Sequence, residues 1–273
     1  MPNHILWVES RPVTAEREDE YNLWYNHFHL HQVLALPGFV AATRYKLSHI
    51  QTEWYPPAQN FPAWPYGKEF THLAIFEIDK HADPQAILEA LEAGESTRQS
   101  ADPENDPVAW GPQWFYESFT EREGPIALKP DGAIQAKPNG DPNHLFVVPI
   151  SPVTAEADVE FNRWYMTQVN VRRPGIASST RYKLSRLQGR IDSRAPEPEG
   201  EWPYGQHWYR TIYDMYEPQT AYDNLKASLP PPQPADSPPR PRRYSWMAPW
   251  PRLSDEHLIY EPVTYRVTPL WPK

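Results

Sequence analysis

The second half of the chain repeats the first half in the same order. Residues 12–16 (PVTAE) return at 152–156, and residues 43–48 (TRYKLS) return at 180–185. Between these runs EYNLWY becomes EFNRWY, and a Pro-Gly pair follows in each half. A chain with this internal similarity must fold as two similar units, so the duplication constrains the fold more than any other feature.

Both copies predict the element order β-α-β-β-α-β. Apolar and alternating runs predict strands over 5–8, 39–47, 70–78 and 114–122 in the first copy, and over 145–148, 176–184, 206–216 and 257–267 in the second. Helices are expected from residue 12 to the Pro-Gly pair and over 84–91, then over 154–170 and 218–228, with Thr14 and Asp83 as caps of the first two. This is the order of a ferredoxin-like unit, in which helices cover one face of an antiparallel sheet.

One face of each sheet would remain bare in such a unit. Two sheets in one chain can cover each other, so we expect an internal dimer, an α+β barrel with a ligand-binding space between the sheets. The expected boundaries are 1–128 for the first repeat, 129–142 for a linker and 143–273 for the second repeat, which contains a proline-rich loop at 229–242. The chain would then be a monomeric pseudo-dimer, or would form a further homodimer.

Composition excludes several classes of function. The formal charge of −9 opposes binding to nucleic acid. The chain has no cysteine for a disulfide, a thiolate metal site or a nucleophile. It has no phosphate loop, dinucleotide fingerprint or serine-nucleophile motif, so no cofactor is expected. Neither a signal peptide nor a membrane span is apparent, which predicts a cytoplasmic protein whose partner is a small molecule and not a membrane.

The two copies differ where histidines are concentrated. Residues 26–31 read NHFHLH, and the aligned residues 166–171 read MTQVNV. The first helix is expected to bury a stripe formed by Tyr21, Trp24, Tyr25, Phe28 and Gln32. His29 would lie on one flank of this stripe and His31 on the other, while His27 would point outward. Histidine chemistry therefore has one location in this chain, not two.

These residues resemble a known family. EYNLWY at 20–25, His29-Leu30, Pro37-Gly38-Phe39 and Arg44-Tyr45 resemble the EthD-like families of the dimeric α+β barrel superfamily, over nearly the whole chain in two tandem units. The resemblance implies the barrel fold and a functional histidine after the Trp-Tyr pair, at His29. Members of the superfamily include polyketide cyclases, muconolactone isomerases, small monooxygenases and haem enzymes, so the resemblance does not select one reaction.

The candidate catalytic residues are His29, His72 and Tyr45. A neutral imidazole takes and returns a proton near neutral pH, and the second copy replaces His72 by Tyr209, so both histidines belong to the asymmetric set. The candidate substrate-binding residues are Arg44, Tyr25, His31, Trp24, Tyr182 and Arg181. Tyr45 and Arg44 recur as Tyr182 and Arg181, which fits shared architecture as well as ligand binding.

A metal site is not expected. A helix scatters the three histidines, and only His27 and His31, four residues apart, could share an ion, without a nearby acid to complete the site. An axial ligand for haem could come from His29, His31, His72 or His207, although no sequence feature favours haem.

The sequence therefore predicts a cofactor-independent enzyme of lyase, isomerase, cyclase or dehydratase type. His29 would act as general acid and base on a small aromatic or unsaturated-ring molecule held between the sheets. Two alternatives stay open: a non-catalytic small-molecule-binding or accessory protein, and a haem- or metal-dependent oxidoreductase on the same fold. Matching WPYG turns at 64–67 and 202–205 would either seal the sheet edges or line the mouth of the binding space.

Overall fold

A computed structural model describes residues 3–50, 70–98, 106–118, 143–150, 158–167, 174–185, 209–228 and 258–269. The expected linker at 129–142, the proline-rich loop at 229–242 and both WPYG turns lie outside these residues, as do His207 and Val169. None of the helices in the described ranges is long and apolar enough to cross a membrane.

Eight antiparallel strands close into a barrel. The strands of the first repeat are β1 (His4–Pro12), β2 (Phe39–Leu47), β3 (His72–Ile78) and β4 (Val108–Ser118), and those of the second are β5 (His144–Ile150), β6 (Ile176–Leu184), β7 (Tyr209–Met215) and β8 (Leu258–Pro262). Their order around the barrel is β1-β3-β2-β8-β5-β7-β6-β4. Each repeat forms a four-stranded sheet, and β2–β8 and β4–β6 pairing joins the two sheets. The predicted internal dimeric α+β barrel is confirmed.

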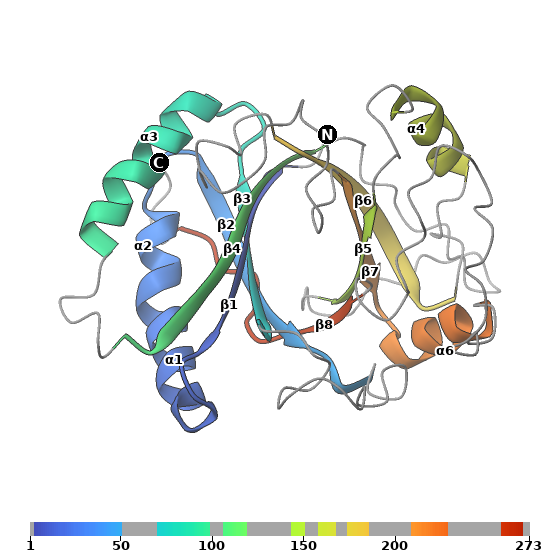
Figure 1. Cartoon of the computed structure of the whole chain (residues 1–273), viewed down its shortest axis with the longest axis horizontal. Coiled ribbons are helices and arrows are strands. Elements are labelled where there is room, and N and C mark those ends of the chain that lie inside the picture. The colour runs from blue at the N-terminus through green and yellow to red at the C-terminus, as the bar shows by residue number, and fades with distance from the viewer. Residues whose placement is uncertain are drawn as a thin grey trace, which may run out of the picture.

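The helices lie outside the barrel, on the side of their own repeat (Figure 1). In the first repeat the chain forms a short 3-10 turn (Ala15–Arg17), α1 (Glu18–Trp24), a π-helical turn (Tyr25–His29), α2 (Leu30–Leu34) and α3 (Pro84–Arg98). The second repeat has α4 (Asp158–Thr167) and α6 (Pro218–Ser228). The same helix-over-sheet layer is therefore built twice.

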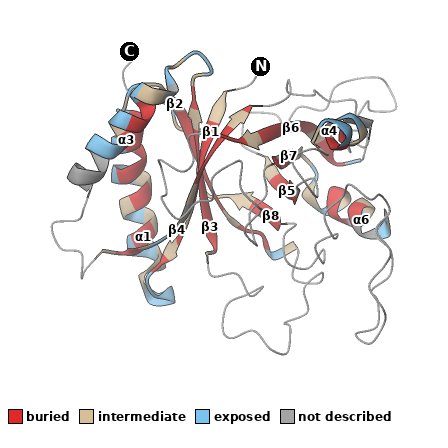
Figure 2. Ribbon diagram, turned by 45° about the horizontal axis from the view of Figure 1, so that its top comes forward, coloured by how far each residue is buried: buried red, intermediate tan, exposed pale blue. Residues whose placement is uncertain are grey.

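Strand alternation divides the buried residues into three cores. Leu6, Val8 and Phe76 belong to a core between the helices and the sheet of the first repeat, and Phe146 and Tyr213 belong to its equivalent in the second. The neighbouring strand positions point inward and form one core inside the barrel, to which both repeats contribute. Figure 2 shows these buried positions along the strands. The bare sheet faces thus cover each other, as the duplication requires.

Some predicted element bounds match the structure and others do not: α3 continues to Arg98 and not only to residue 91, and β4 begins at Val108 and not at residue 114. The strands at 39–47 and 176–184 and the helix at 218–228 have the predicted bounds, and Asp83 caps α3 by accepting the backbone N–H of Gln85 at 3.0 Å. β1 continues to Pro12, so the first helix starts later than predicted. Thr14 occupies the N-cap position with an extended backbone, but its side chain makes no capping hydrogen bond there.

The predicted aromatic stripe is wrong beyond Tyr25. Phe28 is 57% exposed and Gln32 is exposed, whereas His29, Leu30 and Val33 are buried. The cause is the π-helical turn, which holds more residues per turn than an α-helix and rotates every later side chain around the axis. His29 therefore occupies the buried position that α-helical spacing assigns to Phe28.

Candidate functional site

The first sheet separates the candidate residues into two groups. His29 lies against Phe76, in the core between helices and sheet, with a distance of 6.4 Å between ring centroids. Tyr45 and Tyr182 point the other way and belong to the core inside the barrel. The expectation that His29 meets a substrate between the two sheets is therefore wrong, because the strands of the first sheet stand between them.

Three aromatic rings besides that of Phe76 surround His29. Trp24 stacks on it at 4.9 Å with an interplanar angle of 17°, Tyr25 meets it edge-on at 4.8 Å, and Trp110 lies 5.0 Å away. Only 5% of His29 is exposed, while Trp110 is 39% exposed and Trp24 is half-buried. The two tryptophans therefore separate the imidazole from solvent. Sequence reasoning missed Trp110 because the last strand of the repeat was expected to begin at residue 114.

Arg44 places a buried positive charge next to this cluster. Its side chain is fully buried, and its guanidinium lies 4.2 Å from the ring centroid of Tyr25 and 4.8 Å from that of Tyr21. It donates to Asn26 Oδ1, and to Asn22 Oδ1 at 3.1 Å. Tyr25 thus contacts both Arg44 and His29. The second repeat has Met166 in place of Asn26, so part of this arrangement is specific to the first repeat.

His72 lies at the far end of the same interface. It is 4% exposed, its ring is 4.9 Å from that of Tyr21, and its Nδ1 is 3.1 Å from Thr71 Oγ1. Burial, reinforced by the positive charges of Arg44 and Lys46, lowers the pKa of His72 to about 3. The imidazole is therefore neutral at physiological pH. Its 3.7 Å approach to Glu18 is not an ion pair under those conditions.

The remaining histidines of the motif lie nearer to solvent. His31 is half-buried and His27 is exposed. Among the described residues no group of three histidine, aspartate or glutamate side chains could hold a metal ion. Ligation of haem by His29 would require the rings of Trp24, Tyr25 and Trp110 to move, because they pack directly against the imidazole.

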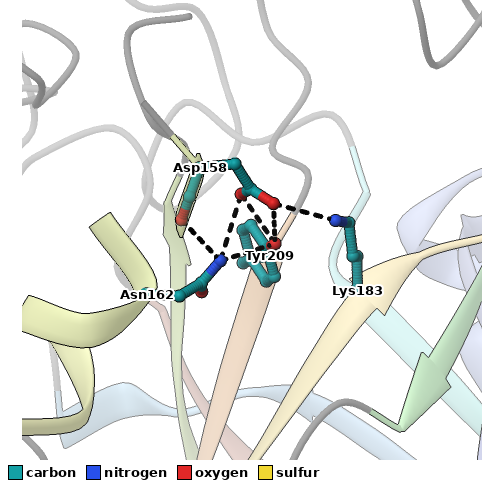
Figure 3. Close-up of polar contacts among 4 residues, drawn as sticks. All are labelled: Asp158, Asn162, Lys183 and Tyr209. Carbon is teal, nitrogen blue, oxygen red and sulfur yellow. Dashed lines mark hydrogen bonds and ion pairs between the residues drawn. The ribbon is translucent and has the colours of Figure 1, made fainter. Parts of the chain in front are cut away.

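The second repeat has a hydrogen-bonded polar cluster at the position of His72 (Figure 3). The Tyr209 hydroxyl donates to Asp158 Oδ1 at 2.7 Å and accepts from Asn162 Nδ2 at 2.9 Å. Lys183 Nζ forms an ion pair with Asp158 Oδ2 at 3.0 Å. Burial, followed by the bond to Asp158, raises the pKa of Tyr209. The hydroxyl therefore stays protonated and is committed to its neighbours.

Arg181 repeats the stacking of Arg44. Its guanidinium lies 4.2 Å from the ring centroid of Tyr165 and 4.7 Å from that of Tyr209, and its side chain is buried. An arginine stacked on a helix tyrosine is thus common to both repeats, as expected for shared architecture. Burial also raises the pKa of Tyr45, which keeps the hydroxyl protonated in the barrel interior.

Sequence reasoning missed a charged pair inside the barrel, Glu9 and Arg210. Arg210 Nη2 lies 3.8 Å from Glu9 Oε1, and Trp7 Nε1 donates to the same carboxylate oxygen at 2.9 Å. The first repeat has Leu73 at the position of Arg210, and the second has Pro149 at the position of Glu9. A comparison of the aligned copies outside the histidine motif could have revealed the pair, because each position is charged in one copy and apolar in the other.

Comparisons with known proteins locate the fold. No protein-family model matches the chain, and no curated protein matches it. An anthrone oxidase-like protein of known structure is 13% identical, with a TM-score of 0.50, over 97% of this chain and 93% of that chain. A dye-decolorizing peroxidase from Bacteroides thetaiotaomicron is 9% identical over 83% of this chain and 84% of that one, with a TM-score of 0.41. Both names are those of oxidoreductases. Of these two likenesses the one to the anthrone oxidase-like protein reaches a TM-score of 0.50, and at 13% identity it concerns the α+β barrel fold alone.

Proposed function

We propose that this chain is an enzyme that removes a proton from a planar aromatic ketone and lets molecular oxygen oxidise the resulting carbanion. His29 would be the base, in the layer between the helices and the sheet of the first repeat. The observation that carries the proposal is the position of His29: a 5% exposed imidazole bounded by Trp24, Tyr25 and Trp110, in a π-helical turn. Single π-helical turns are frequent at functional sites.

The aromatic surroundings favour a flat substrate. Trp24 and Trp110 are the partly exposed members of the cluster, with ring centroids 6.1 Å apart, so a planar ligand approaching from solvent meets their rings before it meets His29. Aromatic side chains bind such ligands by stacking and edge contacts. The EthD-like resemblance of EYNLWY and His29-Leu30 agrees with a proton-transfer role for this histidine.

Arg44 supports proton removal electrostatically. Deprotonation of a carbon that is conjugated with a carbonyl places negative charge on the carbonyl oxygen, and a preorganised positive charge in a water-poor site stabilises such an anion. Arg44 is held by Asn22 and Asn26 and stacks on Tyr25, which in turn contacts His29. The ring of Tyr25 thus contacts both the guanidinium of Arg44 and the imidazole of His29.

Anthrone is the substrate class that combines these features. Its methylene group is acidified by the carbonyl and by two fused rings, so that one base suffices to form a delocalised carbanion. The carbanion transfers electrons to oxygen. In the overall change the methylene group and one molecule of oxygen become a carbonyl group and one molecule of water, which needs no further reductant. The name of the anthrone oxidase-like neighbour motivates this probe, although the same proton removal would also serve an isomerase or cyclase.

The test measures oxygen uptake with anthrone, at a mildly acidic pH where spontaneous oxidation is slow. We expect protein-dependent uptake of one molecule of oxygen per anthraquinone formed, without hydrogen peroxide. His29→Gln should reduce the rate to the background, and His27→Gln, an exposed change on the same helical segment, should keep it. A rate equal to the blank would reject the proposal. A Soret band in the purified protein would favour the haem alternative.

A further inference from the structure

A charged pair in the barrel interior is not explained by the internal symmetry. Glu9 in β1 and Arg210 in β7 alternate with the inward-facing residues Trp7 and Ile212, and their aligned partners are apolar. An eight-stranded barrel is just wide enough to be filled by side chains or to hold one small ligand. A charge placed in such an interior requires a reason.

Arg210 is held by the first repeat, not by its own. Its Nε donates to the Tyr116 hydroxyl at 2.7 Å, and its guanidinium lies 4.3 Å from the ring centroid of Trp7 and 5.3 Å from that of Tyr116. Tyr260 meets Trp7 edge-on at 5.9 Å. The guanidinium is therefore oriented by rings from the opposite sheet.

The two terminal Nη groups of Arg210 are less constrained than its Nε. The 3.8 Å from Nη2 to Glu9 Oε1 exceeds hydrogen-bond length, and among the described residues neither Nη group makes a hydrogen bond. Yet 15% of the Arg210 side chain and 22% of the Glu9 side chain remain accessible. A row of donors and a carboxylate acceptor thus lie side by side, between aromatic rings, inside the barrel.

We propose that this pair binds a small, planar, neutral molecule that carries a carbonyl next to an N–H or O–H group. The carbonyl would accept from Arg210 and the adjacent donor would bond to Glu9, so both charges gain a complementary partner. A neutral ligand is favoured because the pair has no net charge, and an anion would be repelled by Glu9. Trp7 and Tyr116 are almost fully buried and already cover one side of the guanidinium, so the ligand would reach the pair from the accessible sides of Arg210 and Glu9.

This site is independent of the site of His29. The first sheet separates Trp7, which points into the barrel, from Trp24 and Trp110, which lie under the helices. The barrel site would therefore accept its ligand whether or not His29 is catalytic.

The experiment uses 2-naphthamide, which has the required carbonyl and N–H pair, and the indole N–H signals of the protein labelled with ¹⁵N-tryptophan. Trp7→Phe identifies the signal of Trp7, whose Nε1 bonds to Glu9. We expect saturable shifts of this signal, with the signals of Trp24 and Trp110 unchanged. 2-Acetonaphthone, which lacks the donor, should bind at least about tenfold more weakly, since it leaves Glu9 unsatisfied.

Arg210→Leu should weaken 2-naphthamide binding at least about tenfold, because a bond to a charged donor is lost. Leucine is the residue that the first repeat carries at this position, as Leu73. Arg266→Leu removes the same charge from a surface arginine paired with Glu77, and should leave binding unchanged.

If Arg210→Leu unfolds the protein by leaving Glu9 alone, the double variant Glu9→Gln with Arg210→Leu restores neutrality and should fold without binding. Shifts confined to Trp24 and Trp110, shifts that persist at full affinity without Arg210, or no shift of Trp7 at any concentration would each overturn the proposal. The last result would leave the pair as a contact that aligns the two repeats.

Discussion

The two repeats keep the same arginine and surround it differently. Arg44 and Arg181 are both buried and both lie 4.2 Å from a helix tyrosine, Tyr25 or Tyr165. In the second repeat the neighbouring polar groups bond to one another through Asp158. In the first repeat a histidine lies beyond the tyrosine, in an aromatic cluster. After duplication, the packing was kept and the polar positions diverged.

One asparagine shows how this divergence works. Asn162 donates to the Tyr209 hydroxyl, whereas its counterpart Asn22 accepts from Arg44. The backbone position is the same, and the side-chain amide serves as donor in one repeat and as acceptor in the other. The residue on β3 or β7 differs as well: it is His72 in the first repeat, and Tyr209, which accepts from Asn162, in the second. The difference between the repeats is therefore spread over several neighbouring substitutions.

The largest expected effect is the loss of turnover on substitution of His29, which has no counterpart histidine in the second repeat. His29→Ala should lower turnover of the identified substrate by about 100- to 10,000-fold, the usual contribution of a positioned acid or base. Tyr165→Phe, a change in the equivalent layer of the second repeat, should leave turnover within about twofold of the wild type. Steady-state kinetics on folded variants decides. Equal losses in both variants would show that the repeats contribute alike.

His72 is expected to produce the next largest effect, on stability. Its pKa falls from an ordinary value near 6.5 to about 3 in the folded protein, mainly through burial. Between these values the unfolded chain binds the proton more tightly, so the stabilising contribution is complete above pH 6.5 and is lost as the pH falls toward 3. The total is of the order of a few kcal/mol.

Urea titrations across this pH range measure the effect. His72→Tyr introduces the residue of the second repeat and should flatten the pH dependence relative to the wild type. His4, whose pKa is also lowered by burial, is present in both proteins and therefore cancels in the difference. An unchanged slope in the variant would show that His72 is not the group responsible.

The sequence predicted the fold well because the repeat provides two readings of every element. Strand alternation and the Pro-Gly stops were present in both copies, and the bare sheet faces required the barrel. The site was predicted less well. The π-helical turn has no signature in residue spacing, so α-helical geometry assigned Phe28 to the interior. Spacing within one strand also cannot reveal that Glu9 and Arg210, from different repeats, meet across the barrel.

A third prediction compares the two glycines that directly precede β2 and β6, Gly38 and Gly175. Gly38 and Gly175 both have φ of +83°, a left-handed conformation that costs other residues about 1–2 kcal/mol. A Cβ on Gly38 would meet side-chain atoms of Ala82 and Ile87 at 3.1 Å, whereas one on Gly175 would meet backbone atoms of Glu217 and Ala221 at 2.6 Å. Backbone cannot move aside as a side chain can.

Gly38→Ala should therefore destabilise by about 1–2 kcal/mol, and Gly175→Ala by at least about 1 kcal/mol more. Denaturant titrations of the two variants give the comparison directly. The reverse order, or equal losses, would contradict the assignment of the tighter turn to the second repeat.

The smallest expected effect concerns a hydroxyl that only the first repeat has. The Tyr21 hydroxyl and Ser10 Oγ are buried and 2.8 Å apart, whereas the second repeat has Phe161 and Ile150 at these positions. Tyr21→Phe leaves the serine hydroxyl buried without this partner and should cost about 1–2 kcal/mol. Adding Ser10→Ile removes the polar group and should recover most of the loss. The coupling energy from this double-mutant cycle measures how strongly the effects of the two substitutions depend on each other. Strictly additive losses would show that the hydrogen bond between Tyr21 and Ser10 does not couple the two positions.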